Sequence, residues 1–192
     1  GKGKLLSPES GDLVMKGGVK VAYSRDEVED YSSKILGNNL VTKQTGPSGK
    51  IVNNLYIESG CEIVHEYYLA LLVDRESDSL LIMGSKEGGV DIEEVAENNP
   101  KAIHKERFYP SKGLDADKAS SMAKSLELAG KSHDLFVEMA VNLSSLFIER
   151  DCSMIEINPL VRSSDDRIIA LDAKVSFDES ATFRHPWRDE LR

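Results

Sequence analysis

The spacing of hydrophobic residues predicts short strands and a few amphipathic helices. Two long windows, residues 117–129 and 132–150, favour helices. In the second window four apolar residues recur at spacings of four and three and make one apolar stripe: Leu135, Met139, Leu143 and Leu146. A shorter helix containing Ile92 and Val95 is expected after Asp91, whose side chain can cap it.

The first part of the chain favours a small unit of sheet and helix. Residues 19–23 are predicted to form a strand, and Ser24 and Glu27 then form a capping box that begins a helix ending at Gly37. The remaining segments are predicted as a glycine-rich loop over 1–18 and two strands, 40–44 and 52–58, on either side of the turn Gly46-Pro47-Ser48-Gly49.

Two strand pairs are expected in the rest of the chain. Residues 66–74 and 80–83 are rich in β-forming residues and are joined by a polar turn, which predicts a hairpin. Residues 154–161 and 167–174 make a second pair around Ser163-Ser164-Asp165-Asp166. Strands and helices in this order indicate the α+β fold class, with a boundary between two subdomains at Glu58 to Cys61.

Length, composition and charge place the chain among globular proteins. Its 192 residues are 40% hydrophobic and 30% charged, enough to bury a core without disulfides. The formal net charge is −9, which repels phosphate backbones and anionic lipid, so no nucleic acid and no membrane surface is expected as a partner. No apolar stretch approaches the roughly 18 residues that a membrane span needs.

Cysteine and histidine chemistry is not indicated. Cys61 and Cys152 lie far apart with no C-x-x-C motif, which argues against a disulfide scaffold or a zinc knuckle and favours a reducing compartment. Cys152 is expected to be a small buried residue. The histidines show no metal-binding spacing and are interpreted as structural or surface residues: His65, His104, His133 and His185.

A candidate metal site lies in the last expected hairpin. Side chains alternate along a strand, so Glu156 and Asn158 project to one face while Ile155 and Ile157 project to the other. In a hairpin around this turn, residues whose numbers sum to about 330 lie opposite each other, which places Asp172 across from Asn158. Because Mg²⁺ prefers oxygen and is usually held by one or two carboxylates plus phosphates and water, Glu156, Asn158 and Asp172 are candidate ligands. A solvated polar face of the hairpin is the alternative.

Two glycine pairs could approach an anion. Gly1 and Gly3 flank Lys2, and such a segment can lie close to phosphates and neutralise them, although no Walker motif is present. Gly88 and Gly89 precede a helix and could cradle an anion at its start, or simply form a tight turn.

The segment from Tyr56 to Glu66 is a candidate site for a base and a ribose. Backbone groups freed where a strand breaks can pair with the edge of a purine, and the Glu66 carboxylate can accept hydrogen bonds from ribose hydroxyls. Ordinary strand-end carboxylates at Glu58 and Glu66 are the alternative.

Taken in order, these pieces resemble the ATP-grasp region of the β subunit of succinyl-CoA synthetase (succinate-CoA ligase). The resemblance extends over essentially the whole chain, and ordered coverage is more specific than any one motif. The segments that carry it are Gly1-Lys2-Gly3-Lys4, Lys16-Gly17-Gly18-Val19-Lys20, Thr42-Lys43-Gln44-Thr45-Gly46, Gly88-Gly89-Val90-Asp91-Ile92-Glu93, Met154-Ile155-Glu156-Ile157-Asn158-Pro159-Leu160, Leu171-Asp172-Ala173-Lys174 and Phe183-Arg184.

The resemblance implies an ATP-grasp fold in two lobes, a partial small lobe over 1–61 and a larger lobe with the metal-binding hairpin over 62–192. It implies nucleotide-phosphate contacts by Gly1, Lys2 and Gly3. It also implies a base and ribose site at Glu58, Cys61 and Glu66. Mg²⁺ binding is implied for Asn158 and Asp172, with Glu156 an adjacent and weaker candidate.

The implied activity is reversible formation of succinyl-CoA from succinate and CoA with ATP or GTP. The resemblance places the phosphorylated histidine on a partner α subunit, so none of the four histidines here is expected to carry the phosphoryl group. This chain would bind the Mg-nucleotide and stabilise charge on the transferring group. The expected compartment is the bacterial cytoplasm or the mitochondrial matrix.

The chain also departs from that family. A preceding segment with a phosphate-contacting lysine and a following CoA-ligase domain are both missing, so we expect a fragment or processed chain that is inactive alone. The connection from Lys4 to Met15 is longer than in the bacterial form, and Cys61 stands where other side chains occur. Two alternatives remain open: a related acyl-CoA ligase or lyase acting on malate or citrate, and a non-catalytic nucleotide-binding or interaction module. A plain structural α+β domain is a third.

Overall fold

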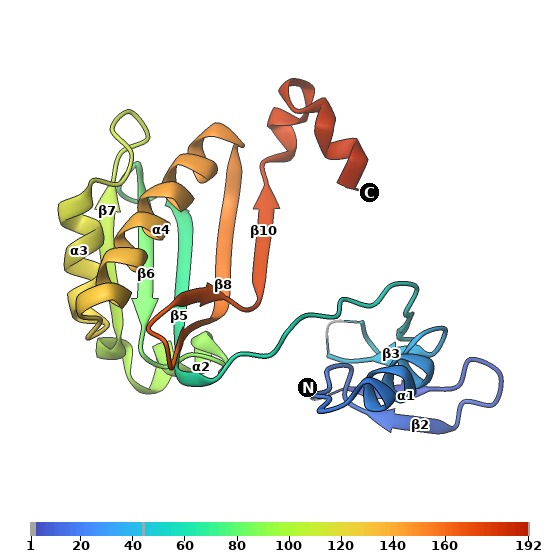
Figure 1. Ribbon diagram of the computed structural model, residues 1–192. Coiled ribbons are helices and arrows are strands. Elements are labelled where there is room, and N and C mark those ends of the chain that lie inside the picture. The colour runs from blue at the N-terminus through green and yellow to red at the C-terminus, as the bar shows by residue number, and fades with distance from the viewer. Residues whose placement is uncertain (1–2, 44, 192) are drawn as a thin grey trace. The chain divides into compact units, whose positions relative to one another are not determined.

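The computed structural model describes residues 3–43 and 45–191 and separates the chain into two compact units, Gly1–Gly60 and Cys61–Arg192 (Figure 1). Each unit has its own antiparallel sheet, so each buries its own core. No helix in the described ranges is both long and apolar enough to cross a membrane.

The N-terminal unit is a small sheet with one helix. Among the described residues its strand order is β2-β1-β3-β4. Leu5 on β1 is fully buried and Ile35 at the end of α1 is almost so. The elements are β1 (Lys4–Leu6), β2 (Leu13–Lys16), α1 (Arg25–Ile35), β3 (Asn39–Val41) and β4 (Lys50–Ile51).

The capping box of α1 is confirmed. The Glu27 backbone N–H donates to Ser24 Oγ at 3.2 Å, and the Glu27 carboxylate accepts the Tyr23 N–H at 2.7 Å. Two donors at the helix start are thereby satisfied. Gly37 follows the last turn with φ of 73°, a left-handed conformation that glycine adopts without steric cost, and it ends the helix as expected.

Three strand predictions for this unit are wrong. Residues 19–23 form no strand, and β1 and β2 lie in the segment expected to be a loop. Val19 and Val21 have a strand-like pattern but are 76% and 68% exposed, because no neighbouring strand takes up their backbone groups. Residues 52–58 are also irregular, although the Val52 backbone pairs with Gly37 and Asn38. Among the described residues of this unit, the strand beyond the turn is the two-residue β4.

The C-terminal unit has a longer antiparallel sheet in the order β10-β8-β5-β6-β7, with β9 paired to β8. Figure 1 shows α3 and α4 side by side over one face of this sheet. The strands are β5 (Ile63–Asp74), β6 (Ser79–Ser85), β7 (Ile103–Phe108), β8 (Cys152–Ser163), β9 (Ile168–Ala170) and β10 (Ala173–Phe177). The helices are α2 (Ile92–Asn98), η1 (Pro100–Ala102), α3 (Ala116–Ser125), α4 (Gly130–Glu149), η2 (Glu179–Arg184) and η3 (Pro186–Leu191).

The sheet buries both faces, and its side chains alternate between them. Leu69 and Leu71 of β5 join the main core under α3 and α4, while Tyr68 and Ala70 pack on the opposite face against Ile92 of α2. On β8, Ile155 and Ile157 belong to the main core, as the alternation predicts. Glu156 and Asn158 are therefore carried on the α2 face.

Helix α4 buries a different stripe from the one expected. Its fully buried positions include Phe136, Ala140 and Ser144, whereas Leu146 is 40% exposed. Small side chains let the helix approach the sheet closely, and Ser144 Oγ accepts the Leu114 N–H at 3.2 Å. The expected stripe lies beside this face, half-buried, and lines a shallow hollow of about 420 Å³.

Two further predictions need correction. Gly130 begins α4 instead of closing α3. Strand β7 is not predicted by the apolar pattern because four consecutive polar or charged residues, His-Lys-Glu-Arg, fill its interior. This composition suits the edge position that the strand occupies. The remaining hairpins, the two long helices and the Asp91 cap of α2 are confirmed, with the Glu93 N–H donating to Asp91 Oδ1 at 3.2 Å.

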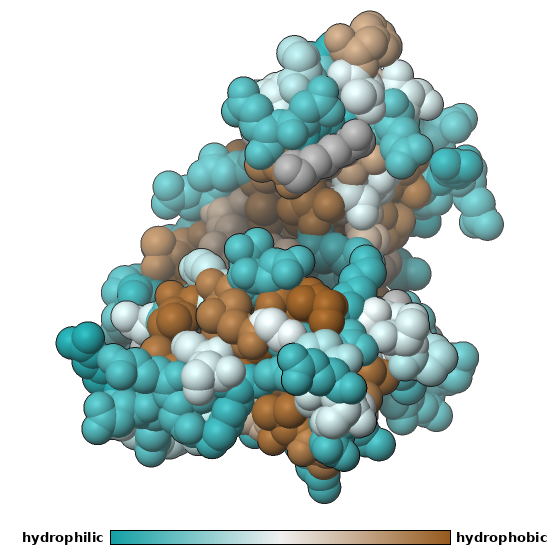
Figure 2. Space-filling view, turned by 90° about the vertical axis from the view of Figure 1, so that its right-hand side faces the viewer, coloured by the Kyte–Doolittle hydropathy of each residue, from teal (hydrophilic) through white to brown (hydrophobic). Residues whose placement is uncertain are grey.

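A second surface hollow, of about 730 Å³, lies beside the C-terminal segment. In Figure 2 brown hydrophobic side chains lie beneath this segment, at the top of the view. The side chains that line the hollow are mostly apolar: Leu146, Arg150, Val175, Phe177, Trp187 and Leu191.

We expect Phe136→Ala to destabilise the C-terminal unit by about 3–5 kcal/mol, since it removes a fully buried ring from the main core. The fluorescence of Trp187, the chain's single tryptophan, can follow chemical unfolding of this unit. Val73→Ala is the matched control: Val73 is 44% exposed, so its loss should cost less than about 1 kcal/mol. Equal shifts for both variants would contradict this packing.

Candidate functional site

The C-terminal hairpin has the register expected from the sequence. Ile157 pairs with Ala173 and Leu160 with Ala170. Between these pairs the Asn158 backbone N–H donates to the Asp172 carbonyl oxygen at 3.0 Å. Asn158 and Asp172 are therefore direct neighbours across two strands.

A β-bulge interrupts β8 at this position. Its neighbour β5 pairs Leu69 with Ile157 but Tyr67 with Leu160, so Asn158 and Pro159 together face a single residue of β5. The Asn158-Pro159 peptide bond is cis. Bulges re-aim side chains, and here the affected side chain is that of Asn158.

The Asn158 side chain binds the loop between β6 and α2 through both of its ends. Its Oδ1 accepts the Gly89 N–H at 2.8 Å, and its Nδ2 donates to the Val90 carbonyl oxygen at 2.9 Å. A backbone N–H can only donate and a backbone carbonyl can only accept, so these partners fix which end of the amide is oxygen. The contacts connect residues 68 and 69 positions apart in the sequence.

The same loop lies tightly against β5. A Cβ at Gly88 would collide with the backbone at Glu66 and Tyr67, and a Cβ at Gly89 would collide with the Glu66 carboxylate. Gly89 also has φ of 68°, which disfavours other residues. The structure thus places Glu66 and Asn158, two of the expected site residues, against the same glycine.

The oxygen atoms on this hairpin fit a divalent cation. Asn158 Oδ1 uses one lone pair for Gly89 and keeps a second. The exposed Asp172 carboxylate forms no hydrogen bond or ion pair with any residue in the described ranges. One amide oxygen and one carboxylate are a donor set that suits Mg²⁺. Within the described residues no group of three or more His, Cys, Asp or Glu side chains could hold a metal alone.

Glu156 already has a partner of its own. It lies next to Lys174 and Ala70 in the sheet and accepts a hydrogen bond from the buried Tyr68 hydroxyl. Burial raises the pKa of Tyr68 above its ordinary value, and the nearby negative charges of Glu156 and Glu93 raise it further. The role of Glu156 as an adjacent, weaker metal-ligand candidate stays a prediction.

The nucleotide-binding candidates are distributed between the two units. Gly1 and Lys2 lie outside the described residues. Gly3 accepts the Gly17 N–H at 2.7 Å, and a Cβ there would press on Leu40 and Thr42. Glu58 is exposed in an irregular segment of the N-terminal unit. Cys61 is half-buried at the start of the other unit. The roles of all these residues stay predictions.

The sequence pattern does not predict the hydrogen bonds from the Asn158 side chain to the Gly88-Gly89-Val90 loop. The glycine pair was recognised as an anion cradle or a tight turn, and the Gly89 N–H is in fact engaged by Asn158. Two adjacent glycines before a capped helix were the one sequence feature that could indicate a close contact of this loop with another part of the fold. The sequence did not reveal which strand would lie beneath them.

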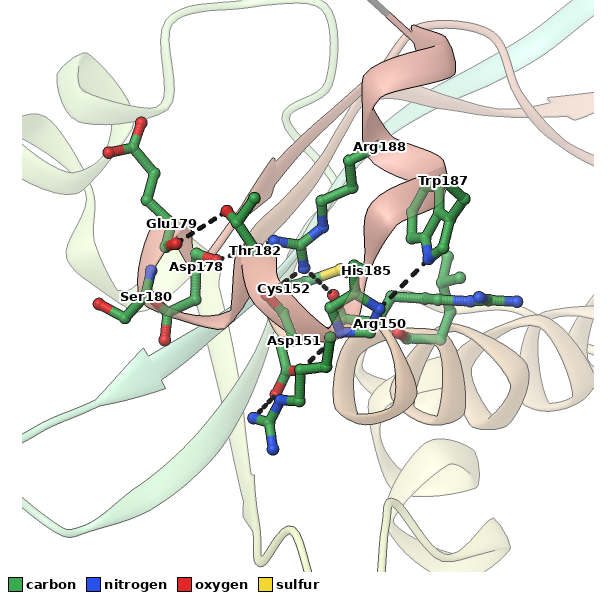
Figure 3. Close-up of polar contacts among 12 residues, drawn as sticks. Arg150, Asp151, Cys152, Asp178, Glu179, Ser180, Thr182, His185, Trp187 and Arg188 are labelled. Atoms are coloured by element: carbon green, nitrogen blue, oxygen red, sulfur yellow. Dashed lines mark hydrogen bonds and ion pairs between the residues drawn. The ribbon is translucent and has the colours of Figure 1, made fainter.

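A second polar cluster lies at the C-terminal end and has a structural role (Figure 3). His185 Nε2 contacts Asp151 Oδ2 at 2.6 Å, and the Trp187 indole N–H donates to His185 Nδ1 at 3.2 Å. Arg184 also pairs with Asp151, at 2.8 Å. The hydrogen bond from His185 and the charge of Arg184 lower the pKa of Asp151.

Arg188 ties the last segment to the sheet. The side chain is buried, donates to the carbonyl oxygens of Asp178 and Arg150, and places its guanidinium carbon 4.5 Å from the centre of the Phe177 ring. Nearby Cys152 is buried, as predicted, and burial raises the pKa of its thiol. These contacts account for His185 without a catalytic role.

Comparison with known proteins defines the class. The sequence model of the ATP-grasp domain family matches residues 1–162 of this chain. The chain therefore belongs to the ATP-grasp family. Among solved structures, ATP citrate lyase from Methanothrix soehngenii in complex with citrate and coenzyme A is similar in fold, with a TM-score of 0.67 and 20% identity over 98% of this chain and 42% of that one.

Comparison with curated proteins points to a narrower group within this family. The chain is 47% identical to the succinate–CoA ligase [ADP-forming] subunit beta of Staphylococcus haemolyticus, over 92% of this chain and 45% of the relative. It is 50% identical to the protein of that name from an Exiguobacterium species, over 88% of this chain and 44% of the relative. It is 48% identical to the one from Campylobacter jejuni, over 95% of this chain and 47% of the relative. The chain thus spans about half the length of these relatives.

Gly88→Ala should destabilise the C-terminal unit by about 1–3 kcal/mol, because the added methyl group meets rigid backbone of β5. Gly60→Ala is the matched control, since a Cβ at Gly60 has no neighbour within 4 Å. Chemical unfolding followed by Trp187 fluorescence measures both. A Gly88→Ala variant as stable as Gly60→Ala would show that the loop does not lie on β5.

Proposed function

We propose that this chain is the Mg-nucleotide-binding part of the β subunit of an ADP-forming succinate–CoA ligase. The observation that carries the proposal is the pairing of Asn158 with Asp172 in a chain about half identical to such subunits. In this proposal the two lobes of the ATP-grasp domain, expected over 1–61 and 62–192, correspond to the units Gly1–Gly60 and Cys61–Arg192. With an α subunit, the complete protein would form succinyl-CoA reversibly from succinate, CoA and ATP.

The chain's own residues would bind and orient the nucleotide. Asn158 and Asp172 would hold Mg²⁺, whose charge offsets that of the nucleotide phosphates when bound. Glu66, which lies against Gly89, would accept hydrogen bonds from a ribose, and Glu58 and Cys61 would contact the base. Gly1, Lys2 and Gly3 would contact the phosphates. These roles are positioning and electrostatics, and covalent chemistry is left to a histidine of the α subunit.

The preferred nucleotide in this proposal is ATP, with GTP as the alternative, because the relatives are named as ADP-forming. Their bacterial origin favours the bacterial cytoplasm as the compartment. A lyase acting on citrate remains the second candidate, supported only by a fold likeness at 20% identity.

Asp172→Asn should weaken Mg-nucleotide use by the complete complex, because it replaces a carboxylate ligand by a neutral amide. We expect kcat/KM for Mg-ATP to fall by at least the roughly 10- to 100-fold that loss of an outer-shell metal partner costs. Thioester formation from succinate and CoA is the assay. Asp166→Asn, an exposed change in the hairpin turn, is the control and should be silent. Equal activity of both variants would remove the metal role of Asp172.

The 192-residue chain alone should not make succinyl-CoA. The proposal places the phosphorylated histidine and the CoA site in other parts of the complex, so no thioester should form from succinate, CoA and Mg-ATP with catalytic amounts of this chain. The test is to measure the rate of thioester formation in this mixture with and without the chain. An enzymic rate of formation would show that the chemistry resides here.

A further inference from the structure

We propose that Asn158 is a positioning residue as well as a metal ligand: its amide group holds the Gly88-Gly89-Val90 loop against β5 and β8. The part of this inference that concerns the cation rests on the proposed function. The part that concerns the loop rests on the contacts alone.

The two side-chain hydrogen bonds are complementary to the loop backbone. Gly89 offers an N–H and Val90 a carbonyl, and the Asn158 amide answers with an acceptor at 2.8 Å and a donor at 2.9 Å. A primary amide provides both from one planar group, whereas a carboxylate provides acceptors alone. A carboxylate at this position could accept from Gly89 and bind a cation, but it would place a negative oxygen against the Val90 carbonyl.

Among the described residues, the hydrogen bonds between this loop and β8 are the two made by the Asn158 side chain. Gly88 lies against the β5 backbone and Gly89 against the Glu66 carboxylate. The Asn158 amide therefore closes a bridge from β5, across the loop, to β8. Through this bridge, the position of Glu66 is linked to the oxygen atoms of the hairpin. This explains why the ligand at 158 is an amide although a carboxylate would bind Mg²⁺ more strongly.

Asn158→Asp separates the two roles, because aspartate keeps a metal-binding oxygen and loses the donor to Val90. Asp172→Asn is the matched control, since it weakens the other ligand and touches no loop contact. Hydrogen exchange of the Gly89 amide in the 192-residue chain reports the loop without any nucleotide. Aspartate still accepts the Gly89 N–H, so the expected effect comes from easier opening of the loop once the bond to Val90 is lost. We expect this opening to speed Gly89 exchange by about tenfold in Asn158→Asp, and Asp172→Asn to leave the exchange unchanged. Unchanged exchange in Asn158→Asp overturns the inference.

A measurement on the unaltered chain covers the case in which the variant does not fold. The Asn158 Nδ2 protons should exchange with solvent more slowly than those of Asn142, an exposed asparagine in the same unit. Equal exchange rates for the two side-chain amides would overturn the inference without any substitution.

The complete complex distinguishes this inference from the proposed function. Raising Mg²⁺ should partly restore Asp172→Asn but not Asn158→Asp, whose defect lies in the loop. Full restoration of Asn158→Asp by Mg²⁺ would mean that Asn158 acts as a ligand alone, which overturns the positioning role. An unaltered complex that makes no succinyl-CoA would refute the proposed function, while the exchange results would still decide the role of the loop.

Discussion

The arrangement of the site depends on backbone pairing across the C-terminal hairpin. One hydrogen bond, from the Asn158 N–H to the Asp172 carbonyl, makes the two residues direct neighbours across the hairpin. The strand that carries Asn158 lies between β5 and β10, and its apolar residues Ile155 and Ile157 are fixed in the main core. Because alternation then sends the polar side chains to the other face, burial on one side of β8 determines the chemistry available on the other.

The polar face is ordered by few contacts, each with a distinct cause. The bulge at Asn158 re-aims its side chain toward the loop before α2. Two glycines let that loop approach β5 more closely than any other residue could. Glu156 lies near the Tyr68 hydroxyl, and burial together with this nearby charge raises the pKa of Tyr68. The Asp172 carboxylate forms no hydrogen bond or ion pair with the described residues, so its oxygen atoms are available to a cation.

Much of this could be predicted from the sequence, and the failures have physical causes. The register of the last hairpin followed from one turn and strict alternation, so Asn158 and Asp172 were paired correctly. The strand expected at 19–23 failed because β propensity is expressed only where a partner strand exists. The buried stripe of α4 was misjudged because small residues such as Ala140, not the larger leucines, allow the closest packing. The link between Asn158 and Gly89 spans 69 residues and depends on tertiary contact, which no local pattern encodes.

In the proposed site, Asn158 and Asp172 together bind a divalent cation. Titrating the isotopically labelled 192-residue chain with Mn²⁺ tests it most directly, because the paramagnetic ion broadens the NMR signals of nearby amides and can substitute for Mg²⁺ at oxygen ligands. If the two residues bind the ion, the amides of Asn158, Asp172 and Gly89 should broaden first. Broadening that begins elsewhere on the acidic surface, and leaves these three signals sharp, would contradict it.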